Sequence, residues 1–230
     1  MKIVCMDYCT TNDMLINRDK TKVMLFNTAR DFDFMPKLTI NQESCLEVVE
    51  QFKLLGVILR SDLKWHDNSN YICSRGYARL WMIRRLKSLG ADLDDMLDVY
   101  CKQIRSILEL AVPVWQPNLS NHEVKQIERV QKTAFHVILG QDYHDYPTAL
   151  ATLGVQSLSE RRVTLCLNFA RKALKHEKYQ SWFSPATARS STKPETRAPE
   201  PQLRFKNVTC RTSRYEDSPI PYLTRLLNEN

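Results

Sequence analysis

The sequence lacks the glycine-rich motifs with which many enzymes hold phosphate groups. Its 230 residues contain five glycines, and neither G-x-x-x-x-G-K-[ST] nor G-x-G-x-x-G occurs. In such loops the backbone N–H groups contact the phosphates of a nucleotide, and glycine allows the close approach. The absence of both motifs disfavours the common classes of nucleotide-dependent enzyme.

Paired metal-binding and redox motifs are also missing. The seven cysteines are scattered from Cys5 to Cys210 without a C-x-x-C pair, and the five histidines show no metal-ligand spacing to another His or Cys. We interpret the cysteines as reduced thiols of an intracellular protein, nuclear or cytoplasmic, and expect no cofactor and no metal. A Cys–His pair from distant positions, such as Cys101 and His136, stays open.

The sequence has no long apolar run. Residues 106–122 carry few charges, but Glu109, Pro113 and Pro117 interrupt them. A bilayer span needs about 20 apolar residues, so we expect no membrane partner.

Acidic pairs suited to a catalytic metal are scarce. Asp94 and Asp95 are adjacent and follow Asp92 at the predicted start of a helix. Neighbouring helical side chains point about 100° apart, so the two carboxylates do not converge on one ion. We interpret these residues as stabilising the helix start, where negative charge complements the helix dipole.

Basic residues are in excess. The formal net charge is +7, and residues 184–214 contain seven Lys and Arg against two Glu. This balance favours partners that carry phosphate groups.

Hydrophobic patterning predicts a mainly α protein with a small N-terminal β region. Short apolar runs at 22–26, 37–40 and 53–59 are separated by turn residues and predict strands. Helical periodicity with start and stop residues then predicts five helices. Their approximate ranges are 66–89, 92–111, 120–140, 147–154 and 157–176.

Local chemistry defines several of the predicted helix ends. Ser120 with Glu123, and Ser157 with Glu160, match the S-x-x-E capping box. Gly90 is a suitable left-handed stop, and Pro113 is expected to end the second helix.

Composition divides the chain into four regions. We expect a β region over 1–64, a helical domain over 65–183, a disordered basic linker over 184–216 and a short helix over 217–230. Residues 184–201 are rich in Ser, Thr, Pro and charge, so they bury too little apolar surface to offset the entropy of ordering.

The predicted first helix combines basic and aromatic residues. Tyr71, Tyr77 and Trp81 are interleaved with five basic side chains, and Asp67 is its only acidic residue. The five are Arg75, Arg79, Arg84, Arg85 and Lys87. This combination suits phosphate contact with base or sugar stacking. The alternative is an ordinary amphipathic helix, with Tyr77 and Trp81 in the core and the arginines solvated.

Four blocks of sequence, in this order, resemble non-LTR retrotransposon reverse transcriptases. They are 16–27 (INRDKTKVMLFN), 51–68 (QFKLLGVILRSDLKWHDN), 105–120 (RSILELAVPVWQPNLS) and 127–140 (IERVQKTAFHVILG). The resemblance covers about residues 12–183, and 218–228 (SPIPYLTRLLN) is similar to the extreme C-terminus of the family.

The resemblance implies a role for each region. Residues 1–64 correspond to the end of the palm, with Lys20 as a relic of the palm lysine and 52–58, including Lys53, as the hairpin that grips the primer. The helices after Trp65 correspond to the thumb and post-thumb segments. The catalytic aspartates of the family are expected upstream of residue 1, so we expect no polymerase activity from this chain alone.

Two functional hypotheses follow. In the first, the chain is a catalytically incompetent relic that binds RNA, DNA or RNA–DNA hybrid weakly and without sequence preference. Its binding residues are Arg75, Arg79, Arg84, Arg85, Lys87, Lys53 and Trp81. In the second, it is a helical interaction module or an inert open reading frame. There, 127–140 packs on a partner helix, or truncated palm edges near Lys22 and Lys53 self-associate.

Overall fold

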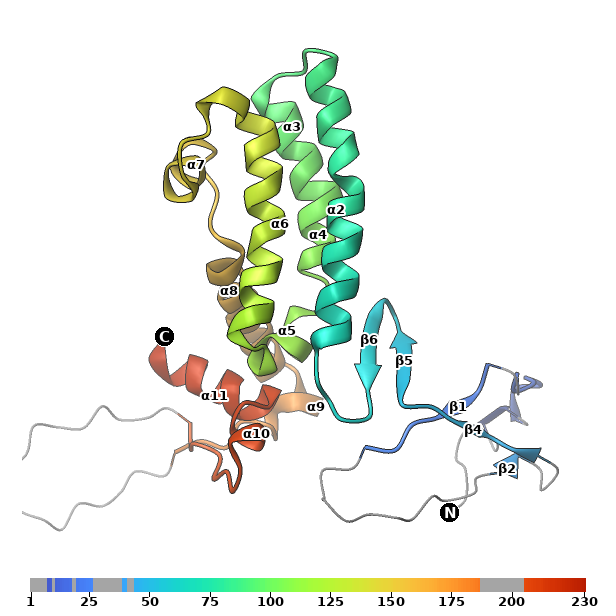
Figure 1. Ribbon diagram of the computed structural model, residues 1–230. Helices are drawn as coiled ribbons and strands as arrows, with labels where there is room; N and C mark the ends of the chain where they lie inside the picture. Colours follow the sequence, from blue (N-terminus) through green and yellow to red (C-terminus); the bar gives the residue numbers. More distant parts are fainter. Residues whose placement is uncertain (1–7, 10, 18–19, 27–38, 41–43, 187–204) are drawn as a thin grey trace, which may run out of the picture. The chain divides into compact units, whose positions relative to one another are not determined.

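The structure is a computed structural model that describes all residues except 1–7, 10, 18–19, 27–38, 41–43 and 187–204 (Figure 1). The chain divides into two compact units, Met1–Trp65 and His66–Asn230. Among the described residues the strands belong to the first unit, and long helices make up most of the second. The expectation of a mainly α protein with a small N-terminal β region is confirmed.

The first unit contains three pairs of short strands. The parallel pair joins β1 to β4, and the two antiparallel pairs join β2 to β3 and β5 to β6. The bounds are β1 Lys22–Val23, β2 Thr39–Ile40, β3 Ser44–Cys45, β4 Glu47–Val48, β5 Gln51–Leu54 and β6 Val57–Arg60. The runs predicted over 22–26 and 37–40 are therefore strands only in part, and 37–38 lie outside the described residues.

The apolar run 53–59 is a hairpin and not the single strand that its hydrophobicity predicts. Leu54 pairs with Val57, and the turn residues Leu55 and Gly56 have φ of 48° and 90°. Two positive φ values in succession suit the type I′ turn that matches the twist of a hairpin. Gly56 reverses the chain where an alternating strand would have continued.

The second unit follows the predicted order of helices. Helices α2, α6 and α8 are the long members, and shorter segments connect them. The bounds are α2 His66–Ser88, α3 Leu93–Val99, η1 Tyr100–Arg105, α4 Ser106–Leu108, α5 Val112–Trp115, η2 Gln116–Asn118, α6 Asn121–Leu139, η3 Gly140–Asp142, α7 Tyr146–Thr152, α8 Leu158–Lys175, α9 Glu177–Gln180, α10 Ser213–Glu216 and α11 Pro219–Glu229.

The helix ends follow the local chemistry read from the sequence. Both capping boxes form, at Ser120 before α6 and at Ser157 before α8. Asp92 caps α3 by accepting the N–H of Asp95 at 2.9 Å. Gly90 follows α2 with φ of 78°.

The helix predicted over 92–111 is interrupted. Its middle part, η1, is a π-helix, and the chain then turns at Ala111, which has a left-handed backbone with φ of 53°. Pro113 does not terminate the helix; it lies in the first turn of α5. The turn is held by the indole N–H of Trp115, which donates to the carbonyl of Leu110 at 2.8 Å.

The core lies where α2 and α6 pack together against η1 and α4. Figure 1 shows α2 and α6 rising in the same direction, with α3 and α4 returning beside them. A glycine permits the close approach: a Cβ on Gly76 would lie 2.9 Å from Cγ1 of Val130 and 3.3 Å from Cδ2 of Leu108. The apolar side of 127–140 is buried within this unit, so it needs no partner helix for its burial.

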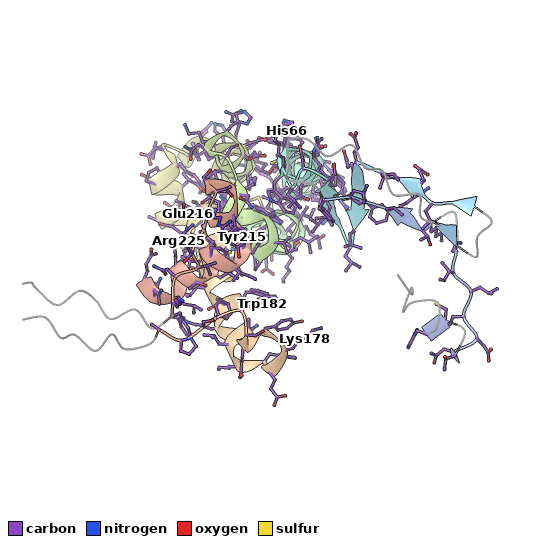
Figure 2. The ribbon with its side chains drawn as sticks, turned by 90° about the horizontal axis from the view of Figure 1, so that it is seen from below. His66, Lys178, Trp182, Tyr215, Glu216 and Arg225 are labelled. Atoms are coloured by element: carbon purple, nitrogen blue, oxygen red, sulfur yellow. The ribbon has the colours of Figure 1, made fainter. Side chains whose placement is uncertain are left out.

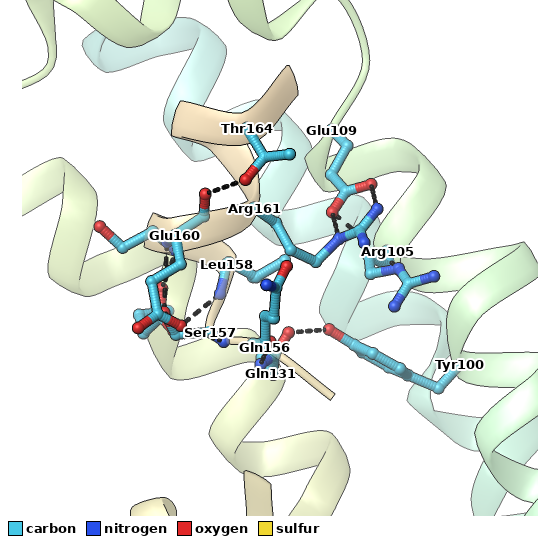
Figure 3. Close-up of polar contacts among 12 residues, drawn as sticks. Tyr100, Arg105, Glu109, Gln131, Gln156, Ser157, Leu158, Glu160, Arg161 and Thr164 are labelled. Atoms are coloured by element: carbon cyan, nitrogen blue, oxygen red, sulfur yellow. Dashed lines mark hydrogen bonds and ion pairs between the residues drawn. The ribbon is translucent and has the colours of Figure 1, made fainter. Parts of the chain in front are cut away.

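A buried polar network fastens α8 to α6 (Figure 3). Glu128 accepts the hydroxyl of Tyr146 and the backbone N–H groups of Leu158 and Ser159 at 3.0 and 3.1 Å. Gln131 donates to Tyr146 at 2.9 Å and accepts from Tyr100 at 2.5 Å. The carboxylate of Glu128 thus serves as a second cap at the start of α8, where N–H groups lack helical partners.

Residues beyond α8 return to the helical unit. Helix α11 packs on α8 and α5 with Leu223, Leu226 and Leu227 buried. Phe205 is buried and forms an isolated antiparallel β-bridge with Pro185. The described ends of the segment predicted as a disordered linker are therefore ordered, because Phe205 supplies an apolar anchor; residues 187–204 lie outside the described residues.

Candidate nucleic-acid interface

Helix α2 has one face in the core and one in solvent. Ile72, Leu80 and Ile83 are buried, whereas Trp81 and Tyr77 are 58% and 37% exposed. The interpretation of Tyr77 and Trp81 as core residues is therefore wrong. Tyr77 and Trp81 therefore present aromatic surface that a ligand can contact.

Two arginines lie one turn after the exposed tryptophan on α2. Residues three and four positions apart are neighbours on one side of a helix. Tyr77 lies four positions before Trp81, and Arg84 and Arg85 lie three and four positions after it; all are exposed. The middle of α2 therefore presents an aromatic pair next to two guanidinium groups.

Helix α6 contributes further basic residues that the sequence analysis missed. Lys125 and Arg129 are exposed on α6, opposite its buried side. Asn70 of α2 accepts a hydrogen bond from Gln126 at 2.8 Å, which fixes α6 beside α2. The periodicity of α6 identifies both residues as solvated, but their proximity to α2 depends on tertiary packing.

The open sides of α2 and α6 face the same way. Both helices contact the segment of α3, η1 and α4: Arg79 of α2 donates to the carbonyl of Gln103 at 2.7 Å, and Gln131 of α6 accepts from Tyr100. Because that segment covers an inner side of each helix, we group the exposed residues of the opposite sides as one candidate surface. We call it the Trp81 surface, made of Tyr77, Trp81, Arg84, Arg85, Lys125 and Arg129.

Helices α2 and α6 carry three carboxylates, none of which is among the residues of this surface. Asp67 lies in the first turn of α2. Glu123 is used in its own capping box, and Glu128 accepts hydrogen bonds at the start of α8. The charged side chains of the Trp81 surface are therefore all cations, and anionic partners are favoured there.

The five basic residues predicted on α2 separate into three groups. Arg84 and Arg85 belong to the Trp81 surface. Lys87 donates to the carbonyls of Val137 and Ile138 at 2.7 and 3.0 Å, which satisfies the C-terminal end of α6.

Arg79 and Arg75 make the other contacts. Arg79 holds η1 through Gln103. Arg75 donates to the hydroxyl of Tyr71 at 2.7 Å, with its guanidinium 5.6 Å from the centre of that ring. Lys87 and Arg79 thus have structural partners, and Arg75 remains exposed beside Tyr71.

Lys20 and Lys53 lie in the first unit. Lys20 is exposed, and its backbone N–H donates to the side chain of Asn17 at 3.1 Å. Lys53 is exposed on β5 opposite Ile58. Neither belongs to the surface built on α2 and α6.

Cys101 and His136 are the residues that could have supported a separate enzymatic site. Burial raises the pKa of the Cys101 thiol, which disfavours the reactive thiolate. The ring of His136 lies 4.9 Å from that of Tyr143. Among the described residues no group of three or more His, Cys, Asp or Glu is placed to hold a metal ion.

No described helix combines the length and apolar character that a bilayer span requires. Comparison with known proteins gave no match: no family model fits the chain, and neither the curated proteins nor the solved structures include a significant relative.

Proposed function

We propose that the helical unit binds nucleic acid through the Trp81 surface, contacting phosphates without reading base sequence. The observation that carries the proposal is Trp81 itself, 58% exposed, with Arg84 and Arg85 three and four positions after it on the same helix. Guanidinium groups neutralise phosphates, and an exposed indole packs against the sugar groups of a strand. Arg129 and Lys125 extend the positive charge across a second helix.

The proposed origin is the C-terminal part of a non-LTR retrotransposon reverse transcriptase, with the first unit as palm end and the second as thumb. The resemblance of four ordered blocks supports it. The hairpin of β5 and β6 lies where the resemblance implies the primer grip, and α2 begins where it implies the thumb. The proposal includes no polymerase activity for these residues alone, because the segments with the family's catalytic aspartates are not among those that match.

The substrate that fits this proposal best is an RNA–DNA hybrid or another duplex. We expect fluorescence anisotropy of a labelled hybrid to show binding whose affinity falls with salt, with a log–log slope of about −0.9 per neutralised phosphate on DNA. The double variant Arg84→Ala/Arg85→Ala should bind more weakly and reduce the slope by about 2, since each basic side chain accounts for about 1.

A matched control separates the surface from net charge. Lys206 and Arg211 are exposed and lie outside the Trp81 surface. Lys206→Ala/Arg211→Ala also removes two positive charges, and it should retain the salt dependence of affinity that the parent shows. Equal losses in the two double variants, or binding insensitive to salt, would contradict the proposed surface.

A specific observation also favours the second hypothesis for the first unit. Leu54 and Leu55 on the β5–β6 hairpin are 49% and 90% exposed, and Phe52 is 38% exposed. Apolar side chains concentrated on a hairpin favour contact with another protein surface or a second copy. Sedimentation of the full chain with Leu54→Lys/Leu55→Lys tests this: a shift to a smaller species supports association through the hairpin, and an unchanged monomer opposes it.

A further inference from the structure

Three aromatic rings follow α8 at every third position. The ring centres of His176 and Tyr179 are 5.0 Å apart, and those of Tyr179 and Trp182 are 4.8 Å apart. The planes are inclined by 38° and 50°. Figure 2 shows Trp182 and Lys178 on this same segment. We call these three residues the aromatic ladder.

Backbone geometry produces the ladder. The carbonyl of His176 accepts from Tyr179 at 2.9 Å, and that of Tyr179 accepts from Trp182 at 3.0 Å. Residues three apart are neighbours on one side of a helical turn, so every third side chain of this segment lies on one side. Phe183 is buried and its ring centre lies 6.1 Å from that of Phe205, so the end of the ladder is anchored.

Positive charge surrounds the ladder. Four basic residues between 171 and 178 are exposed, against the single exposed carboxylate of Glu177 in that range. They are Arg171, Lys172, Lys175 and Lys178. No ion pair joins any of the four to another described residue, and the ammonium of Lys178 lies 5.7 Å from the ring centre of Tyr179.

We propose that the aromatic ladder binds unpaired nucleotides of a nucleic-acid strand. Bases stack on His176, Tyr179 and Trp182, and Lys172, Lys175 and Lys178 contact the phosphates. Stacking needs an open base face, which a duplex hides and a single strand exposes, and it tolerates every base. The inference goes beyond the Trp81 surface, is carried by different residues, and stands if that surface binds nothing.

Tryptophan fluorescence reports on each surface separately. Trp65 and Trp115 are 5% and 0% exposed, so Trp81 and Trp182 are the indoles that a ligand can reach. In Trp81→Phe, titration with unlabelled oligo(dT) at low salt should quench the remaining accessible indole, Trp182. In Trp182→Phe the quenching should be much smaller. Quenching that disappears in Trp81→Phe and persists in Trp182→Phe would overturn the proposal.

Affinity provides the second readout. Tyr179→Ala should weaken the binding of labelled oligo(dT) about fivefold or more, because stacking contributes about 1 to 3 kcal/mol per base. Lys175→Gln/Lys178→Gln changes exposed side chains only and should weaken binding with a reduced salt slope. If Tyr179→Ala fails to fold, the double lysine variant decides alone, and an unchanged affinity there overturns the proposal.

Variants of the Trp81 surface and of the aromatic ladder should lose affinity for different ligands. Arg84→Ala/Arg85→Ala should lose affinity for the hybrid and keep affinity for oligo(dT), and the ladder variants should do the reverse. Hybrid binding that survives the arginine changes rejects the Trp81 surface and leaves the ladder standing. Absence of any oligo(dT) binding at low salt rejects the ladder whatever the hybrid result.

Discussion

Two sides of α6 use polar residues in different ways. Toward α8, Glu128 and Gln131 form a network in which each has several protein partners. Toward solvent, Arg129 and Lys125 are exposed beside α2. The difference teaches that a charged residue on a helix stabilises the fold when a second element supplies partners and remains available to a ligand when none does.

Removing the centre of the inner network should have the largest effect. Glu128→Ala leaves two N–H groups of α8 and the hydroxyl of Tyr146 without their acceptor. Hydrogen bonds to charged groups contribute about 1.5 to 3 kcal/mol each, so we expect a loss of about 3 kcal/mol in the free energy of unfolding, measured by urea denaturation. Glu128→Gln keeps one acceptor and should lose less; equal stability of Glu128→Ala and parent would show that the network is dispensable.

Arg162 tests whether burial alone makes a charged residue structural. Its side chain is fully buried, and Nε donates to Gln116 at 2.6 Å, but Nη1 and Nη2 have no hydrogen-bond partner among the described residues. Burial lowers the pKa of this guanidinium, as expected for a desolvated cation.

Replacement of such a charge by an apolar side chain of similar length is often neutral or stabilising. Arg162→Met should therefore unfold at the same or a higher urea concentration than the parent. The gain in the free energy of unfolding should be about 1 to 2 kcal/mol at most. The matched change Arg161→Met removes a guanidinium that is paired with Glu109 at 3.0 Å and should destabilise. A loss above about 3 kcal/mol in Arg162→Met would mean that its unpartnered N–H groups meet a partner in solution.

Lys87 and Arg85 sharpen the comparison within one helix turn. Lys87→Ala removes two hydrogen bonds to the end of α6 and should cost about 0.5 to 1 kcal/mol, because the exposed ammonium keeps part of its interaction with water. Arg85→Ala provides the comparison at the same end of α2. In thermal unfolding, Lys87→Ala should be less stable than Arg85→Ala. A larger loss of stability in Arg85→Ala would contradict the assignment of Lys87 as a structural residue and of Arg85 as a residue that can bind a ligand.

The smallest change in stability is expected at the Trp81 surface. Arg84→Ala/Arg85→Ala should stay within about 0.5 kcal/mol of the parent in urea, as surface substitutions away from structural contacts generally do. The same variant should lose hybrid affinity. If the variant is destabilised enough to explain its loss of hybrid binding, the difference between residues that stabilise the fold and residues that bind a ligand is not supported.

Local chemistry made much of the fold predictable. Ser120, Ser157 and Gly90 mark helix ends because their partners lie within four residues. The hydrophobic pattern of 53–59 missed the hairpin at Gly56, which only the resemblance implied, and the π-helix was not predicted at all. Hydrophobicity identifies a strand or helix but not where its backbone reverses or widens. The partners of Glu128 lie 18 to 31 residues away, and no local rule connects them.

The candidate sites were predictable to different degrees. Arg84, Arg85 and Trp81 were identified from the mixture of basic and aromatic residues on one helix. Arg79 and Lys87 were included for the same reason, although distant carbonyls occupy them. The aromatic ladder carries a readable signal, aromatic residues at every third position, but the last helix predicted before it ends at 176, so most of these residues lay outside the predicted helices.

The π-helix at η1 holds one residue more than an α-helix of the same length would. Wider turns absorb an inserted amino acid without a change in the connecting loops, so a chain one residue shorter here could continue as an ordinary helix from α3 into α4. Each residue turns an α-helix by about 100°, and the wider turns of η1 absorb that rotation, so that Leu108 keeps its place beside Gly76. Single-residue deletions between Tyr100 and Arg105 should therefore be tolerated better than deletions of equal size within α2 or α6, which makes η1 a segment that buffers the helical register.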